Sequence, residues 1–220
     1  MDKSFYFDVL YPLQNDVLQV INLLETGFYL TGGTASSRGY LHHRFSDDLD
    51  LFVNDDPQFI LWAERIIQSL NQTSGWSCQV LNRDERFVRL SLNHEHIQLK
   101  IELVNDVPAH VGVIENHSIL GRLDSKENIL ANKITALLSR EEPKDLADIW
   151  GFCCQLGISI DAAIHDARSK AAGIFPPDLA RVLDSTSADD WQVIRWIDAP
   201  LVDKYIADLK RLAEQLIIGG

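Results

Sequence analysis

The chain has 220 residues, 46% hydrophobic and 24% charged, which is ordinary for a folded protein of one large or two small domains. Its formal net charge of −12 argues against a nucleic-acid binder that relies on a broad basic surface. No membrane span, signal peptide or disulfide framework is visible, and Cys78, Cys153 and Cys154 have no metal-ligand spacing, so we expect a cytoplasmic protein.

The first half of the chain is expected to mix helices and strands. Apolar residues at helical spacing predict a helix over 12–25, and Asp55-Asp56-Pro57 begins a second helix that reaches about residue 70. A short helix over 34–41 follows the glycine pair Gly32-Gly33. Strands are predicted over 28–31, 46–53, 76–81, 87–92, 96–104 and 114–120, the fourth and fifth of them as a hairpin.

After Gly121 the pattern becomes helical. Helices are predicted over about 127–140, 144–155, 160–170, 176–184, 187–197 and 200–217. Asp124 or Ser125 is the expected N-terminal cap of the first of them. We therefore expect an α+β chain with a mixed α/β domain over 1–122 and a helical domain over 123–220 that packs on it.

Two aspartates share one face of the strand predicted over 46–53. Side chains two apart in a strand point the same way, so Asp48 and Asp50 lie about 6–7 Å apart while Leu49 and Leu51 face the opposite side. At that distance the two charges repel by about 2–3 kcal/mol. A divalent cation with oxygen ligands, such as magnesium, would relieve the repulsion, whereas a solvated edge strand is the simpler alternative.

Glu102 is a candidate third carboxylate. It follows Lys100 on the polar face of the strand predicted over 96–104. If that strand neighbours the strand of the two aspartates, all three carboxylates converge and could hold one or two magnesium ions. The alternative is an exposed ion pair between Lys100 and Glu102.

The two helices that follow carry charges where apolar residues are expected. Lys133 falls within the apolar arc of the helix over 127–140. In the next helix, Asp145 falls within the buried arc and Asp148 lies just outside it. A buried structural ion pair, or a lysine that reaches out to solvent, would explain part of this pattern. It explains less well why these charges concentrate on two successive helices.

Two blocks of this sequence resemble a known family. Gly32-Gly33-Thr34-Ala35, followed by HRFSDDLDLF over 43–52, resembles the signature of the AbiEii/AbiGii toxin-type nucleotidyltransferases of the DNA polymerase beta-like superfamily. Lys133 and the run KDLAD over 144–148 resemble the second block of that family. The resemblance covers about residues 28–155, and it implies a polymerase-beta-like mixed sheet with flanking helices, followed by an all-helical C-terminal region.

The resemblance also implies roles for individual residues. Asp48 and Asp50 would bind magnesium, with Glu102 as a third ligand at a position where the superfamily usually has aspartate. Gly32, Gly33 and Thr34 would form the turn that binds the nucleotide phosphates. Lys133 would contact the triphosphate, Asp148 would be a catalytic or substrate-positioning residue, and Asp145 would take part in nucleotide binding.

The expected function is magnesium-dependent transfer of a nucleoside monophosphate from an NTP to an acceptor hydroxyl. The resemblance suggests a toxin that acts on RNA such as tRNA and has a cognate antitoxin. Two alternatives stay open. One is a small-molecule nucleotidyltransferase of the aminoglycoside-modifying kind. The other is a nucleotide-binding regulatory or interaction protein without turnover. This alternative is favoured by Glu102 in place of aspartate and by the acidic C-terminal helices.

Overall fold

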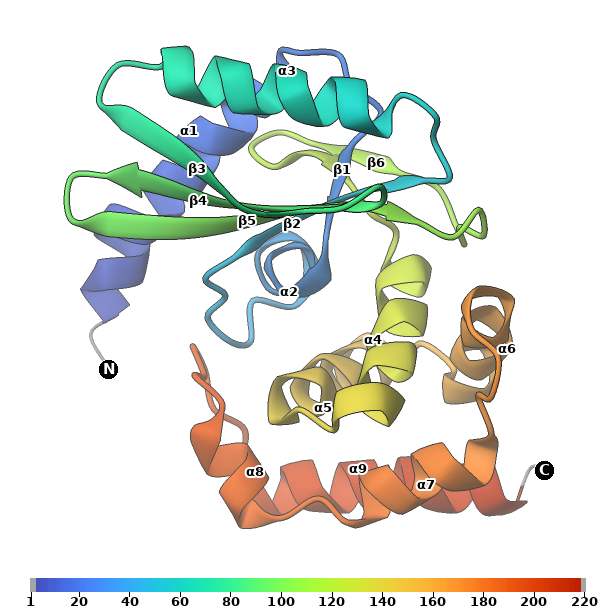
Figure 1. The fold of residues 1–220 in the computed structure, drawn as a ribbon. Coiled ribbons are helices and arrows are strands. Elements are labelled where there is room, and N and C mark those ends of the chain that lie inside the picture. The colour runs from blue at the N-terminus through green and yellow to red at the C-terminus, as the bar shows by residue number, and fades with distance from the viewer. Residues whose placement is uncertain (1–2, 219–220) are drawn as a thin grey trace. The chain divides into compact units, whose positions relative to one another are not determined.

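The chain passes several times between two structural units. The computed structural model describes residues 3–218 (Figure 1). The first unit contains Met1–Ala35, Ser46–Pro108 and Val113–Asp124, and the second contains Ser36–Phe45, Ala109–Gly112 and Ser125–Gly220. The last change of unit falls at 124/125, and two short segments from the range expected as the α/β domain belong to the second unit.

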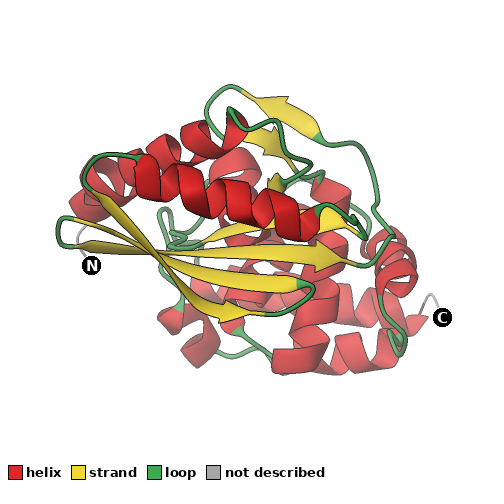
Figure 2. Cartoon of the chain, turned by 45° about the horizontal axis from the view of Figure 1, so that its top comes forward, coloured by secondary structure: helices red, strands yellow, loops and turns green. Residues whose placement is uncertain are grey.

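A mixed sheet is the centre of the first unit, and within residues 3–218 it has seven strands in the order β3-β4-β5-β2-β1-β7-β6. The pairs β2–β5 and β1–β7 are parallel, and the other neighbours are antiparallel. Figure 2 shows the twist of the long strands. The strands are β1 (Tyr29–Thr31), β2 (Leu49–Asn54), β3 (Trp76–Arg83), β4 (Phe87–His94), β5 (Ile97–Asp106), β6 (Glu115–His117) and β7 (Gly121–Leu123).

Helices flank both faces of this sheet. The N-terminal segment is a π-helix, η1 (Phe5–Leu10), that continues into α1 (Tyr11–Asn22), and α3 (Phe59–Gln72) follows β2. Figure 1 shows α3 over one face of the sheet and α2 (Gly32–Thr34) on the other. The face beneath α3 is apolar because alternate residues of β2 and β5, such as Leu51 and Leu103, are buried there.

The second unit is helical. Helix α7 packs against α9, and α4 packs against α5 and α6. Trp150, Trp196 and Tyr205 form an aromatic cluster whose ring centroids lie 5.5–6.1 Å apart. The helices are α4 (Lys126–Arg140), α5 (Pro143–Trp150), α6 (Ile160–Lys170), α7 (Pro176–Asp184), α8 (Ala188–Val193) and α9 (Val202–Ile218), with the π-helices η2 (Ala35–Leu41) and η3 (Gly151–Gln155).

The expected α+β fold is confirmed, with local differences. The strand predicted over 114–120 is a hairpin, β6–β7, whose turn is held by the ring of His117, which accepts the backbone N–H groups of Ile119 and Leu120 at 3.1 Å. The helix predicted over 144–155 changes from α5 to η3 at Gly151, and η1 was not predicted. No helix within residues 3–218 combines the length and hydropathy needed to cross a membrane.

Candidate active site

Asp50 lies at the centre of the sheet, between β1 and β5. Its Cα pairs with Thr31 on one side and with Glu102 on the other. Asp48 directly precedes β2, and Leu49 between the two aspartates is fully buried on the opposite face. The expected neighbourhood of the two strands is therefore confirmed, and it brings the three carboxylates onto one face of the sheet.

The ammonium group of Lys100 lies among these carboxylates. Its Nζ is 2.7 Å from Oδ2 of Asp48 and 3.4 Å from Oε1 of Glu102. Burial alone would lower the pKa of Lys100, but the hydrogen bond to Asp48 and the charges of Asp48, Glu102 and Asp50 outweigh it and raise the pKa. Lys100 is thus a counter-ion built into this face of the sheet.

A second cation holds Glu102. Arg89 is its Cα partner on β4, and Nε of Arg89 donates to Oε1 of Glu102 at 2.9 Å. The same carboxylate oxygen therefore faces both Arg89 and Lys100. These two cations already compensate the negative charge of Glu102. The role of Glu102 as a third metal ligand stays a prediction.

The turn at Gly32 lies in close contact with the carboxylate of Asp50. Gly32 begins α2 with a φ of +65°, a conformation that L side chains rarely adopt. A Cβ at this position would lie 2.1 Å from Oδ2 of Asp50. Glycine is required here both by the backbone conformation and by the close approach of the carboxylate, so the turn and the aspartate share one small space.

The hydroxyl of Thr34 is turned into the protein. It donates to the backbone carbonyl of Asp48 at 2.5 Å and is hydrogen-bonded to Oγ of Ser46 at 3.0 Å. Thr34 thereby fixes the segment that leads into β2. The phosphate-binding role of Gly32, Gly33 and Thr34 stays a prediction.

One buried carboxylate beside the turn was missed as a site residue. Asp124 follows β7 and is fully buried, and Oγ1 of Thr31 donates to its Oδ2 at 2.6 Å. The sequence pointed to Asp124 only as a possible helix cap. The cap is Ser125, whose hydroxyl accepts the backbone N–H of Asn128 at 3.0 Å. Asp124 instead anchors the end of β1, where the Gly32 turn begins.

The second unit contains a buried charged cluster that joins three parts of the chain. Nε and Nη2 of Arg44 donate to the two oxygens of Asp148 at 2.8 and 2.7 Å. Nζ of Lys133 lies 2.7 Å from Asp148 and 2.9 Å from Asp145. Nε2 of His43 lies 3.0 Å from Asp148. The structure thus brings Lys133, Asp145 and Asp148 together.

The buried ion pair that was the structural alternative for these charges is present between α4 and α5. Lys133 is 6% exposed, so it does not reach out to solvent from the edge of the apolar arc. Arg140, on the same helix, donates from Nε to Oδ2 of Asp145 at 2.8 Å. Both aspartates of α5 are fully buried, and each has at least one cationic partner close enough for a direct ion pair.

Electrostatics within this cluster favour a buried carboxylate and a neutral imidazole. Burial alone would raise the pKa of Asp148, but Arg44, Lys133 and the hydrogen bonds from His43 and Arg44 outweigh it and hold the pKa well below its usual range. Burial would lower the pKa of Lys133, but the charges of Asp148 and Asp145 raise it. Burial lowers the pKa of His43, more than Asp148 can compensate.

His43 and Arg44 had no role assigned from the sequence. They lie in an irregular segment between η2 and β2, where no periodicity reveals burial. The segment is held by backbone bonds to the stretch after α8: Phe45 N–H donates to Arg195 O at 2.7 Å, and Ile197 N–H donates to His43 O at 2.9 Å. The only available signal was their position in the block that carries the family resemblance.

The residues of the first unit fit a divalent cation on two carboxylates. Within residues 3–218, no group of three or more His, Cys, Asp or Glu side chains is arranged to hold a metal. Asp48 and Asp50, however, supply oxygen donors on one face, which is the ligand type that magnesium prefers. The ammonium of Lys100 lies 2.7 Å from Oδ2 of Asp48, so a positive charge is already in contact with this carboxylate.

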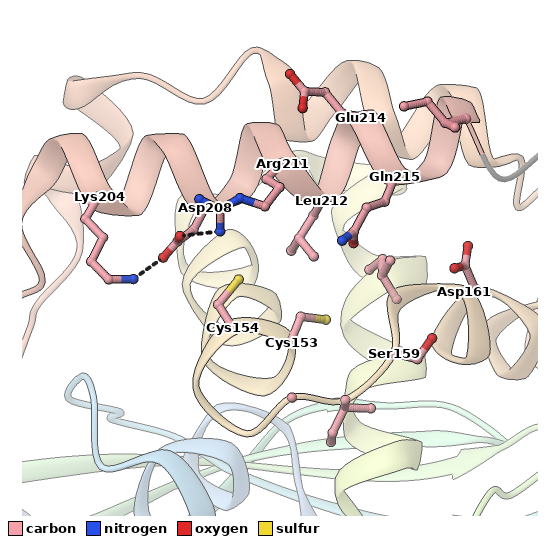
Figure 3. Close-up of a pocket in the computed structure, with 14 residues that line it drawn as sticks. Cys153, Cys154, Ser159, Asp161, Lys204, Asp208, Arg211, Leu212, Glu214 and Gln215 are labelled. Carbon is pink, nitrogen blue, oxygen red and sulfur yellow. Dashed lines mark hydrogen bonds and ion pairs between the residues drawn. The ribbon is translucent and has the colours of Figure 1, made fainter.

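A pocket of about 850 Å³ in the second unit is not the candidate site. It lies between α9 and the loop before α6 and contains none of the predicted site residues (Figure 3). Asp208 accepts hydrogen bonds there from Lys204 and Arg211, which neutralise it. Burial raises the pKa of the neighbouring thiols, Cys153 to about 12 and Cys154 to about 11, so neither is a reactive thiolate near neutral pH.

Comparisons with known proteins give both a family and a fold. The profile of a family described as "Nucleotidyl transferase AbiEii toxin, Type IV TA system" matches residues 17–195. The nucleotidyltransferase toxin MenT4 from Mycobacterium tuberculosis shares the fold with a TM-score of 0.68 at 15% identity, over 95% of this chain and 83% of that one. JHP933 from Helicobacter pylori gives 0.60 at 20% identity, over 94% and 92%. No protein of curated function matched in sequence.

Proposed function

The chain belongs to the AbiEii family of nucleotidyltransferase toxins from type IV toxin–antitoxin systems, and from this membership we propose that it moves a nucleoside monophosphate from an NTP to an acceptor hydroxyl with the help of magnesium. The observation that carries the proposal is the position of Asp50 on β2 against the Gly32 turn, with Asp48 two residues earlier in the chain. Two carboxylates next to a glycine turn suit a metal-bound triphosphate, because phosphoryl transfer relies on positioning and charge neutralisation.

The residues around the Gly32 turn would then have distinct roles. Asp48 and Asp50 would hold the metal, and magnesium bound there would supply positive charge against the phosphates and lower the pKa of an acceptor hydroxyl. The turn Gly32-Gly33 carries no side chains of its own, so its backbone would be able to approach the phosphates closely. Asp124 and Thr31 keep the end of β1 in place beneath this turn.

The proposed acceptor is RNA, with tRNA as the first choice, and a cognate antitoxin is the proposed protein partner. Family membership supports both. With a net charge of −12, we expect no broad electrostatic binding to the RNA backbone, so the protein should contact only a short RNA segment near the reacting hydroxyl. The same charge favours a second candidate, transfer to a small cationic acceptor such as an aminoglycoside.

The test is an incubation of the purified chain with each radiolabelled NTP, magnesium, and either total tRNA or an aminoglycoside panel. We expect label in tRNA, release of pyrophosphate, and loss of both in Asp50→Asn. The control is Asp55→Asn at the other end of β2, which removes a carboxylate that pairs with Arg86. Label in the aminoglycoside alone would select the second candidate. Magnesium-independent NTP binding without pyrophosphate release would identify a non-catalytic binding protein.

A further inference from the structure

The carboxylates proposed to bind magnesium already have a cationic partner from the chain itself. Lys100 extends from β5 to Asp48, its Nζ 2.7 Å from Oδ2, and it also faces Glu102 at 3.4 Å. Arg89 fixes Glu102 from the other side at 2.9 Å. Two of the carboxylates on this face, Asp48 and Glu102, therefore contact two cations, and the cation at Asp48 belongs to a flexible side chain.

We propose that Lys100 competes with the divalent cation for Asp48 and must move away before the metal binds. The inference rests on the proposed function of Asp48 and Asp50. An ammonium in contact with a carboxylate oxygen and a divalent ion on the same carboxylate repel each other strongly at such short range. The two occupants therefore exclude one another or weaken each other's binding.

The side chain of Lys100 is free to make this movement. It is 40% exposed, and the carboxylate of Asp48 is 36% exposed, so the ammonium can exchange its partner for water without crossing the core. Arg89 differs in this respect, because its guanidinium binds Glu102 and no contact to Asp48 is present. Glu102 keeps Arg89 as a partner when Lys100 leaves, so the displacement creates no isolated buried charge.

Competition of this kind would couple metal loading to the nucleotide. Without a nucleotide, Lys100 satisfies Asp48 and lowers the affinity for a free divalent ion. A triphosphate brings additional negative charge that both the metal and the displaced ammonium can meet. The site would thus load metal and nucleotide together and bind the free ion weakly.

The experiment measures Mn²⁺ binding to the intact chain by electron paramagnetic resonance, with no nucleotide and no turnover. The variants are Lys100→Met, Lys100→Gln as a polar second choice, and Lys100→Arg. The matched control is Arg65→Met, which removes one positive charge from the exposed face of α3 in the same unit. We expect Lys100→Met and Lys100→Gln to bind Mn²⁺ about tenfold more tightly than the wild type. Lys100→Arg and Arg65→Met should stay within about twofold.

Equal Mn²⁺ affinity in the wild type and both neutral Lys100 variants would overturn the competition and leave the proposed function intact. No Mn²⁺ binding in any variant would remove the metal site itself, and with it the competition. A gain of equal size in Arg65→Met would assign the effect to net charge and also overturn the proposal. Thermal unfolding with added Mg²⁺ gives a second readout, because ligand-induced stabilisation grows with affinity, so the shift should be larger in Lys100→Met.

Discussion

Arg44 donates hydrogen bonds from Nε and Nη2 to the two carboxylate oxygens of Asp148, at 2.8 and 2.7 Å, although the two residues are 104 positions apart in the sequence. Both side chains are buried within the second unit, and Lys133 approaches the same carboxylate at 2.7 Å. Asp148 is therefore the common partner of two buried cations. Removing a member of such a cluster is strongly destabilising when it leaves a buried charge without an opposite partner.

We predict that Asp148→Asn lowers the free energy of unfolding by about 3–5 kcal/mol, because it leaves the guanidinium of Arg44 buried without a carboxylate. Urea denaturation gives this number. The control is Arg181→Met, which breaks the exposed pair of Arg181 with Glu141 and should cost less than about 1 kcal/mol. Similar losses of unfolding free energy in the two variants would mean that breaking the buried Asp148 cluster costs no more than breaking an exposed ion pair.

Acidification should destabilise the protein through His43. Burial holds the folded pKa of His43 below its ordinary value of 6.5, against the opposing effect of Asp148. The unfolded chain therefore binds more protons below about pH 6.5, and stability falls as pH falls from there, by at most about 1.4 kcal/mol per pH unit. Asp148 contributes in the same direction, but only below about pH 4, because its folded pKa also lies below its ordinary value.

The measurement for this prediction is urea denaturation at pH 7.5 and 5.5 for the wild type and for His43→Gln. We expect the variant to lose a substantial part of the difference between the two pH values, since glutamine does not titrate. An unchanged difference would show that other groups cause the acid sensitivity.

The sequence predicted those parts of the site that lie on regular elements. Strand alternation placed Asp48 and Asp50 on one face and Glu102 on the polar face of its own strand, and the helical wheel placed Lys133 and Asp145 within buried arcs, because both patterns follow from fixed backbone periods. The contact between Lys100 and Asp48 depends on the register of β2 against β5, which no local pattern encodes.

The remaining features could not be predicted because they lie on irregular or very short segments or depend on the sheet topology. Arg44 lies between two elements, and its partner is far away in the chain, so neither periodicity nor spacing could connect them. The hairpin β6–β7 has strands of only three residues, too short for a visible alternation. The role of Asp124 follows from the parallel pairing of β1 with β7, which is a property of the topology alone.

Gly32 should not tolerate a side chain. Gly32→Ala places a methyl group 2.1 Å from Oδ2 of Asp50 and adds the cost of a positive φ, which is about 1–2 kcal/mol. The control is Gly75→Ala, with a φ of +81° and its nearest contact, the ring of His94, at 3.7 Å. We expect Gly32→Ala to lose at least about 1 kcal/mol more stability than the control in urea denaturation, and to bind Mn²⁺ less tightly. Equal losses would mean that Asp50 moves aside freely.

Lys133 should prove less important for stability than Asp148, although the two are in contact. After Lys133→Met, Asp145 still has Arg140 and Asp148 still has Arg44, so neither buried carboxylate is left alone. We therefore predict a loss of only about 1–2 kcal/mol, the cost of missing hydrogen bonds rather than of an isolated charge. The family resemblance implies a contact between Lys133 and the triphosphate, and if that contact exists, the folded variant should bind NTP about tenfold more weakly. Calorimetric titration with NTP measures the affinity, and urea denaturation of the same samples measures the stability. If Lys133→Met loses as much stability as Asp148→Asn while its NTP affinity is unchanged, Lys133 is a purely structural residue.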